Sequence, residues 1–124
     1  MTRQKLLIVD DEAAARDSLA RLLAAQGYSV RTAVDSQEAS RLLALEPAHT
    51  ILLDIDLPHV PGDSFTPFLH IRYPKTRIIF MSGQYDMVNP ERFGDNTLYF
   101  RKPIDIDTLL ETLANSEDST ATMH

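Results

Sequence analysis

The 124 residues of the chain have the size of one compact domain, and 44% of them are hydrophobic, so we expect a folded globular protein. No apolar run approaches the roughly 20 residues of a transmembrane helix and no signal peptide is evident, so we expect a cytoplasmic protein without membrane contact. Because cysteine is absent, we expect neither disulfides nor thiolate metal sites. A formal net charge of −6 argues against direct nucleic-acid binding, which needs clustered Lys and Arg, and favours a protein or a small ligand as partner.

Two helices in the first half of the chain are predicted from apolar spacing and from residues that start or stop a helix. Residues 13–26 carry leucines at helical spacing and precede Gly27, which suits a helix end. A second helix begins after Asp35, which forms a capping-box pattern with Glu38, and ends before Pro47. The leucines at helical spacing in the first helix are Leu19, Leu22 and Leu23, and the residues expected on the inward face of the second helix are Ala39, Leu42 and Leu43.

Short aliphatic runs alternate with the helices and predict strands. Because strand and helix alternate about five times, we expect an α/β fold, a doubly wound, three-layer sandwich in which helices cover both faces of a parallel sheet. The strands are expected at residues 5–9, 28–33, 50–53, 77–81 and 98–100.

The helices of the second half are predicted to be less regular. Pro67 falls near the first turns of a third helix, and Pro74 ends that helix. Between residues 82 and 98, Pro90 and Gly94 interrupt a segment with few apolar residues. We therefore expect the fourth helix to be short or distorted.

The end of the chain is predicted to hold one more helix and a tail. Asp105 suits the start of this closing helix, and the polar residues 116–124 have no periodicity. We expect a single domain at residues 1–115 and a flexible tail at 116–124.

Polar residues stand just past the predicted strands. In doubly wound sheets, ligands bind at the carboxyl ends of the strands, so these residues are expected to converge. Crowded carboxylates repel, and a divalent cation with oxygen ligands, Mg²⁺ above all, would relieve the repulsion. A metal beside an ammonium and a hydroxyl suits a phosphoryl group. The residues are Asp10, Asp11, Glu12, Asp54, Asp56, Ser82, Gly83, Lys102 and Pro103.

Four motifs, each after a predicted strand, resemble those of the receiver domains of bacterial two-component response regulators. They are VDDE (9–12), LLDIDLPHVPG (52–62), FMSG (80–83) and YFRKP (99–103). The resemblance runs from residue 5 to about residue 115. It implies the flavodoxin-like receiver fold, with a five-stranded parallel sheet of order 2-1-3-4-5.

The resemblance also implies the roles of the acidic residues. Asp54, which ends the third strand, would accept the phosphoryl group. Asp11 would bind Mg²⁺ directly, Asp10 would act largely through a water molecule, and Asp56 would offer its backbone carbonyl to the metal. The side chain of Asp56, together with Gln84, is a candidate for tuning the decay of the phosphorylated form.

The residues after the fourth and fifth strands take their expected roles from the same resemblance. Ser82 would donate a hydrogen bond to a phosphoryl oxygen, and Lys102 would pair with another. Tyr99 occupies the position of the aromatic switch, whose ring turns inward when the hydroxyl moves toward the phosphate. The peptide bond before Pro103 is usually cis in the family.

The expected function is phosphoryl transfer in signalling. A sensor histidine kinase or a phosphotransfer protein would donate the group, and a downstream protein effector would read the resulting change of conformation. Such a domain catalyses its own phosphorylation and slow dephosphorylation but is not an ordinary enzyme. We expect a monomer or a weak dimer.

Other functions fit parts of the pattern. A haloacid-dehalogenase-like phosphatase uses a similar set of residues but has its Asp-x-Asp strand first, and a flavodoxin-like nucleotide binder needs a Gly-rich phosphate loop that is absent here. A receiver cut from a longer DNA-binding regulator is a further alternative to the stand-alone receiver that we favour.

Single residues also have simpler interpretations. Asp10 and Asp11 also suit the start of a helix, Ser82 with Gly83 suits a turn, and Tyr99 suits a half-buried strand position.

Overall fold

A five-stranded parallel sheet forms the centre of the protein, as predicted. The computed structural model describes residues 4–55, 62–83 and 98–122, with side chains except at 62–64 and 116–122. The order β2-β1-β3-β4-β5 confirms the order that the resemblance implied. The strands are β1 (Lys5–Val9), β2 (Ser29–Ala33), β3 (Thr50–Asp54), β4 (Arg77–Ser82) and β5 (Leu98–Arg101).

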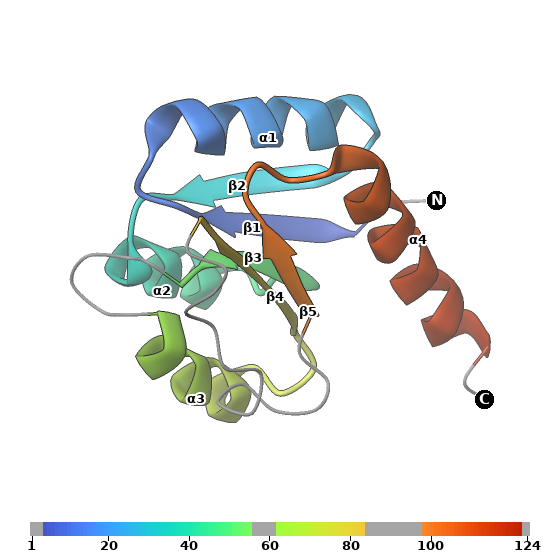
Figure 1. Ribbon diagram of the computed structural model, residues 1–124. Coiled ribbons are helices and arrows are strands. Elements are labelled where there is room, and N and C mark those ends of the chain that lie inside the picture. The colour runs from blue at the N-terminus through green and yellow to red at the C-terminus, as the bar shows by residue number, and fades with distance from the viewer. Residues whose placement is uncertain (1–3, 56–61, 84–97, 123–124) are drawn as a thin grey trace.

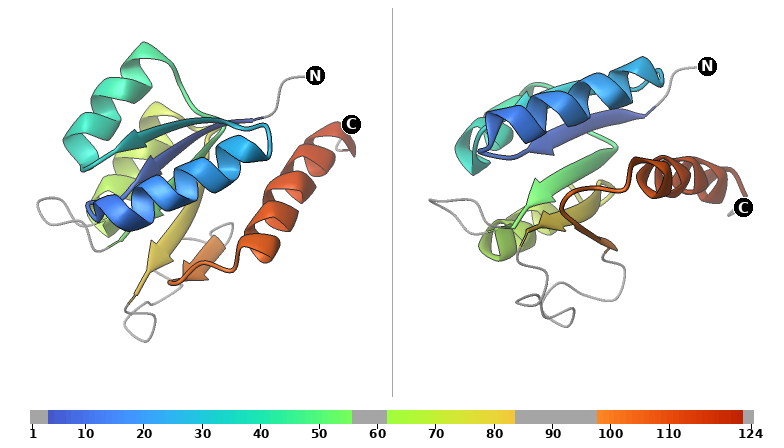
Figure 2. Two further views of the ribbon diagram at one scale, coloured as in Figure 1. Left: turned by 90° about the horizontal axis from the view of Figure 1, so that it is seen from above. Right: turned by 45° about the horizontal axis from the view of Figure 1, so that its top comes forward.

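Helices cover both faces of the sheet and make it the middle of three layers (Figure 1 and Figure 2). The helices α1 (Ala13–Ala25) and α4 (Ile106–Thr122) lie on one face, and α2 (Ser36–Leu45) and α3 (Gly62–Arg72) lie on the other. No helix in the described part of the chain is both long and apolar enough to cross a membrane.

Alternate residues of the strands supply two separate cores. In β1, Leu7 and Val9 join the core beneath α2 and α3, whereas Leu6 and Ile8 join the core beneath α1 and α4. All four side chains are fully buried, and burial of one such side chain contributes about 1.5–3 kcal/mol. The central strands are therefore apolar on both faces, which explains why the sequence shows them as continuous aliphatic runs.

The first two helices begin and end close to the predicted residues. Gly27, just past α1, has a φ of 98°, a conformation that glycine adopts without strain. At the start of α2, the Asp35 carboxylate accepts from the backbone N–H of Glu38 at 2.8 Å, and the Glu38 carboxylate accepts from the backbone N–H of Val34 at 2.9 Å. The predicted capping pattern is confirmed, with one difference. In the usual capping box the Glu38 carboxylate would accept from the N–H of the N-cap residue Asp35, whereas here it accepts from the preceding residue, Val34.

The three leucines at helical spacing in α1 are not all buried. Leu22 is 46% exposed, whereas Leu19 and Leu23 are buried. Leu22 lies at the edge of the apolar stripe, where it lines a groove between α1 and the segment after β5 instead of the core.

Arg31 on β2 caps the C-terminal end of α2, a helix that has no basic residue in its own last turn. Its guanidinium donates to the carbonyl oxygens of Leu42 at 2.9 Å and Glu46 at 2.6 Å. Carbonyls at a helix end lack partners within the helix and carry partial negative charge, so a cation there is stabilising.

We expect Arg31→Ala to lower the free energy of unfolding by about 2 kcal/mol, because it leaves two carbonyls without a charged donor. Arg41→Ala is the matched control, because Arg41 lies on α2 with 70% of its side chain exposed. Arg41→Ala is expected to lower the free energy of unfolding by only about 0.5 kcal/mol. Urea denaturation measures both, and equal losses would contradict the role given to Arg31.

The third helix ends before Pro74, as predicted. The helix α3 continues through Pro67 and ends at Arg72.

The closing helix differs from the prediction at its end. The helix α4 continues past Asn115 to Thr122, because no Pro or Gly interrupts it there. The closing helix is therefore longer than predicted. The division into a domain and a tail remains a prediction. The predicted short or distorted fourth helix falls in residues 84–97, outside the described part of the chain.

Candidate functional site

The predicted site residues meet at the carboxyl ends of the strands. Asp10 follows β1, Asp54 ends β3, Ser82 ends β4 and Lys102 follows β5. The register pairs Val9 with Leu53, Leu53 with Phe80, and Ser82 with Arg101, so these strand ends lie at a similar level. Parallel strands thus bring together residues that are up to 92 positions apart in the sequence.

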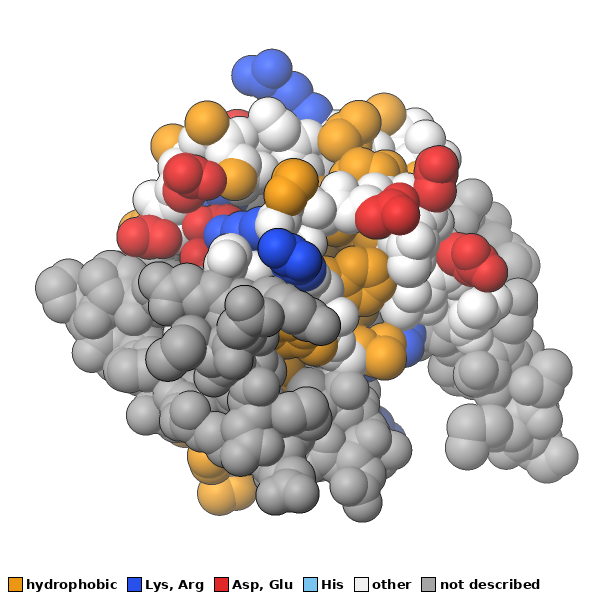
Figure 3. All heavy atoms as spheres, in the orientation of Figure 1, with side chains coloured by type: hydrophobic (Ala, Val, Ile, Leu, Met, Phe, Trp, Pro, Cys, Tyr) orange, Lys and Arg blue, Asp and Glu red, His pale blue; other side chains and the backbone are white. Residues whose placement is uncertain are grey.

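Three carboxylates form a compact cluster. Asp10, Asp11 and Asp54 each present an oxygen within 4.8 Å of the others. Asp10 and Asp54 are buried, with 2% and 3% of their surfaces exposed, whereas Asp11 is exposed. Figure 3 shows one group of acidic side chains on the side of the molecule where α1 begins and a second group on the opposite side, over α4. Ionised carboxylates this close and this buried require compensation by positive charge.

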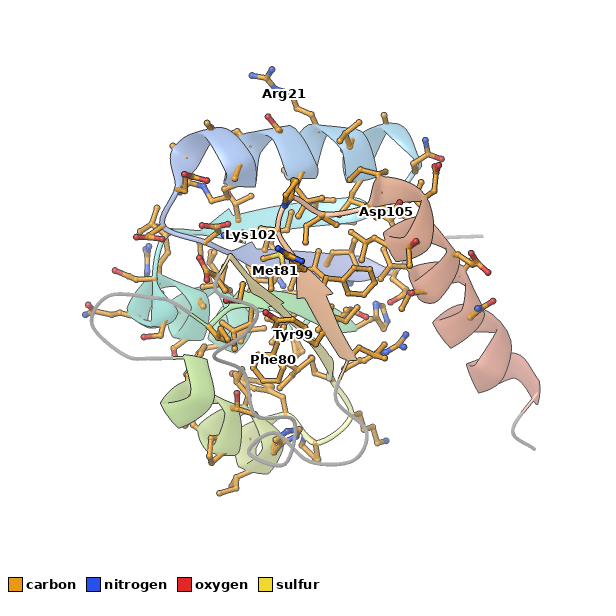
Figure 4. All side chains as sticks on the ribbon, viewed as in Figure 1. Arg21, Phe80, Met81, Tyr99, Lys102 and Asp105 are labelled. Carbon is orange, nitrogen blue, oxygen red and sulfur yellow. The ribbon has the colours of Figure 1, made fainter. Side chains whose placement is uncertain are left out.

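Lys102 supplies part of that compensation. Its Nζ lies 2.8 Å from Asp10 Oδ2 and 3.1 Å from Asp54 Oδ2. Burial disfavours the charged ammonium, but the hydrogen bonds and charges of the two aspartates outweigh burial and raise the pKa of Lys102 above its usual value. The Lys102 side chain, labelled in Figure 4, therefore stays charged at neutral pH.

The cluster retains an excess of negative charge that suits a hard divalent cation. Three carboxylates and one ammonium leave a formal charge of −2. All the candidate ligand atoms are carboxylate oxygens, which are the ligands that Mg²⁺ and Ca²⁺ prefer. The residues present thus fit a divalent cation.

The remaining predicted residues of this region are placed as follows. Ser82 is fully buried at the end of β4, and the backbone N–H of Lys102 donates to its carbonyl at 2.9 Å. Tyr99, labelled in Figure 4, is half-buried on β5 and packs against the core beneath α2 and α3. The peptide bond before Pro103 is cis, as the resemblance implied. Asp56 and Gln84 lie outside the described residues.

The sequence did not reveal the groups that hold Asp10. Its Oδ1 accepts from the backbone N–H of Glu12 at 2.9 Å, and its carbonyl oxygen accepts from Arg16 Nη1 at 3.0 Å. A backbone donor leaves no trace in residue type, and an arginine on an amphipathic helix has the appearance of an ordinary surface residue. No sequence signal distinguished Arg16 from Arg21.

Comparison with known proteins assigns the family. The model of the response regulator receiver domain matches residues 6–114. The chain belongs to this family. Receiver domains are phosphoacceptor signalling modules of two-component systems rather than enzymes in the ordinary sense, and their acidic cluster corresponds to the one seen here. The assignment favours the receiver over the phosphatase and the nucleotide binder.

Curated relatives of this receiver domain differ in length. The response regulator protein PilR of Pseudomonas aeruginosa is 32% identical over 118 residues, which are 94% of this chain and 26% of PilR. Sporulation initiation phosphotransferase F of Bacillus subtilis is 27% identical over 115 residues, which are 91% of this chain and 93% of that protein. The receiver domain thus spans about a quarter of one relative and nearly all of the other.

Solved structures have the same fold as this receiver domain. The CheY-like response regulator receiver domain protein of Methanospirillum hungatei JF-1 has a TM-score of 0.85 at 26% identity, over 99% of this chain and 100% of that one. The signal receiver domain of an HD domain-containing protein from Pseudomonas fluorescens Pf-5 has a TM-score of 0.87 at 26% identity, over 97% and 98% of the two chains.

Proposed function

We propose that the chain accepts a phosphoryl group on Asp54 from the phosphohistidine of a sensor histidine kinase or a phosphotransfer protein. The observation that carries this proposal is the ion pair of 3.1 Å between buried Asp54 and Lys102, within a cluster of three carboxylates. In the reaction, an oxygen of Asp54 bonds to phosphorus, the nitrogen–phosphorus bond breaks, and the donor histidine leaves with its electron pair.

The surroundings of the three aspartates favour Asp54 as the acceptor. Asp11 is exposed. Asp54 ends the strand that lies between β1 and β4, so acidic residues flank it on one side and Ser82 on the other.

The residues of the chain would stabilise the transferred group by charge and hydrogen bonding. Lys102, already 3.1 Å from Asp54, would pair with a phosphoryl oxygen, and the hydroxyl of Ser82 would donate to another. Asp10, Asp11 and Asp54, together with the backbone carbonyl of Asp56, would hold Mg²⁺. The metal would neutralise charge on the phosphoryl oxygens.

The phosphorylated site would be read through its added charge. The phosphoryl group changes one negative charge into about two, and movement of Ser82 toward it would let the ring of Tyr99 turn inward. A downstream protein effector would bind the changed surface, and Asp56 and Gln84 would set the rate of hydrolysis. We propose a cytoplasmic monomer or weak dimer that acts through protein contacts.

A second candidate is a receiver that forms part of a longer DNA-binding regulator. The match to PilR supports a longer protein, because the chain covers only 26% of PilR, whereas the match to the Bacillus phosphotransferase, of which the chain covers 93%, supports the stand-alone receiver.

Mg²⁺ is expected to stabilise the unphosphorylated protein, because it would bind the folded cluster and not the unfolded chain. At ten times the dissociation constant the gain is about 1.4 kcal/mol, which raises the unfolding midpoint by about 5 °C. Thermal unfolding in MgCl₂ and in EDTA with NaCl at equal ionic strength measures the shift. An equal midpoint in both buffers, or the same shift in Asp11→Asn, would contradict a magnesium site.

The proposed function is tested with acetyl phosphate as a small donor. We expect intact-mass spectrometry to find one phosphate adduct when Mg²⁺ is present and none in EDTA. An adduct that forms equally without the metal, or no adduct at all, would contradict the proposal.

A further inference from the structure

We propose that Arg16 is a positioning residue that fixes the peptide between Asp10 and Asp11 and thereby aims the Asp11 carboxylate at the cation site. This inference rests on the proposed function, because it assumes that Asp11 binds Mg²⁺ directly. Arg16 would touch neither the metal nor the phosphoryl group.

Arg16 reaches back from the first turn of α1 to the end of β1. Its Nη1 lies 3.0 Å from the carbonyl oxygen of Asp10, and only 14% of its side chain is exposed. Its Nε lies 3.5 Å from the carboxylate of Asp17, so Asp17 lies beside the guanidinium. The backbone N–H of Arg16 donates to the carbonyl of Glu12 at 2.9 Å, which ties the same residue to the loop before the helix.

The bond from Arg16 completes the immobilisation of Asp10. The N–H of Asp10 donates to Ala33 at 3.1 Å, its Oδ1 accepts from Glu12 at 2.9 Å and its Oδ2 accepts from Lys102 at 2.8 Å. With the carbonyl held by Arg16, every polar atom of Asp10 has a partner in the protein.

Asp11 depends on this arrangement because it has the next position in the chain. The carbonyl that Arg16 holds belongs to the peptide unit that joins Asp10 to Asp11, and a peptide unit is planar. Fixing its direction therefore fixes the position of the Asp11 Cα and limits the directions open to the exposed Asp11 side chain. Groups that orient metal ligands in this indirect way commonly change metal affinity by about 10- to 100-fold when they are removed.

The sign of the effect separates positioning from charge. A guanidinium beside a cation site repels the cation, so removing its charge would by itself strengthen Mg²⁺ binding. Removing a positioning group would weaken the binding. The two effects of Arg16 thus predict opposite changes of one measured constant.

The test is isothermal titration calorimetry, in which Mg²⁺ is titrated into the unphosphorylated full chain and the dissociation constant is measured. We expect Arg16→Met, which keeps the aliphatic stem, to weaken Mg²⁺ binding by about tenfold. Arg16→Lys keeps the positive charge and N–H donors on a single nitrogen but not the planar fork, so its affinity for Mg²⁺ should lie between those of Arg16→Met and the unsubstituted chain. Arg21→Ala is the matched control on α1, because Arg21 points away from the protein in Figure 4, and its affinity should not change.

Unchanged or tighter binding in Arg16→Met would overturn the inference. If Arg16→Met does not fold, as judged by circular dichroism, Arg16→Lys decides: weaker binding than in the unsubstituted chain supports positioning, and equal binding contradicts it. Failure of the unsubstituted chain to bind Mg²⁺ or to accept phosphate would instead overturn the proposed function, so the two failures are distinguishable.

Discussion

Asp54→Asn is expected to give no phosphate adduct with acetyl phosphate and Mg²⁺. An amide cannot form the mixed anhydride, because it lacks the carboxylate oxygen that bonds to phosphorus. The substitution keeps the size of the side chain and an oxygen that can accept from Lys102, which lies 3.1 Å from Asp54. Loss of the adduct would therefore reflect lost chemistry rather than lost structure, and intact mass after incubation measures it.

Asp105→Asn is the matched control for this loss. Asp105 is exposed and accepts from the backbone N–H of Thr108 at 3.2 Å at the start of α4, and asparagine serves equally well at that position. The control should take up phosphate like the unsubstituted chain. An adduct of full yield in Asp54→Asn would contradict the assignment of the acceptor.

Asp54→Asn is also expected to stabilise the protein when no metal is present. Asp10, Asp11 and Asp54 repel one another within 4.8 Å, and loss of one negative charge reduces this repulsion. In EDTA, Asp54→Asn should therefore unfold at a higher temperature than the unsubstituted chain. A lower midpoint would mean that the ion pair with Lys102 outweighs the repulsion.

The second large effect is expected for Lys102→Met. This substitution removes the ammonium that bonds to both Asp10 and Asp54, so the transferred group loses its charged partner while the stem of the side chain is kept. Loss of one such preorganised group reduces rates by about 10²–10³-fold. The initial rate of adduct formation at saturating Mg²⁺ measures the effect.

Lys5→Met is the control for this substitution. Lys5 forms an ion pair of 2.9 Å with Glu46, but both side chains are well exposed, and Lys5 begins β1 at the end opposite to the site. Its loss should leave the rate unchanged and cost at most about 1 kcal/mol of stability. Equal rates in both variants would show that Lys102 has no part in the transfer.

The sheet and the convergence of its strand ends followed from sequence, because apolar strands can be recognised locally and a parallel sheet places the carboxyl ends of all its strands at one edge. Buried parallel strands require apolar residues on both faces, as in the run Leu6 to Val9, and parallel strands bring their carboxyl ends together. The residues at or just past the ends of β1, β3 and β5 could therefore be grouped without coordinates, and Lys102 does bond to both Asp10 and Asp54.

Contacts between side chains and distant backbone could not be predicted in this way. Arg31 closes α2 from a neighbouring strand, and Arg16 holds the carbonyl of Asp10 from a helix. Both depend on where elements pack, which residue spacing does not encode. The end of α4 was placed too early for a different reason, because the polar residues after Asn115 lack apolar periodicity but also lack a helix breaker.

The most direct test locates the phosphoryl group on the chain. Borohydride reduces an acyl phosphate to an alcohol and converts a phosphorylated aspartate into homoserine, which peptide mass spectrometry assigns to a position. After incubation with acetyl phosphate and Mg²⁺, we expect homoserine at position 54 and aspartate unchanged at positions 10 and 11. Homoserine at position 10 or 11, or at no position in a chain that carries phosphate, would contradict the account.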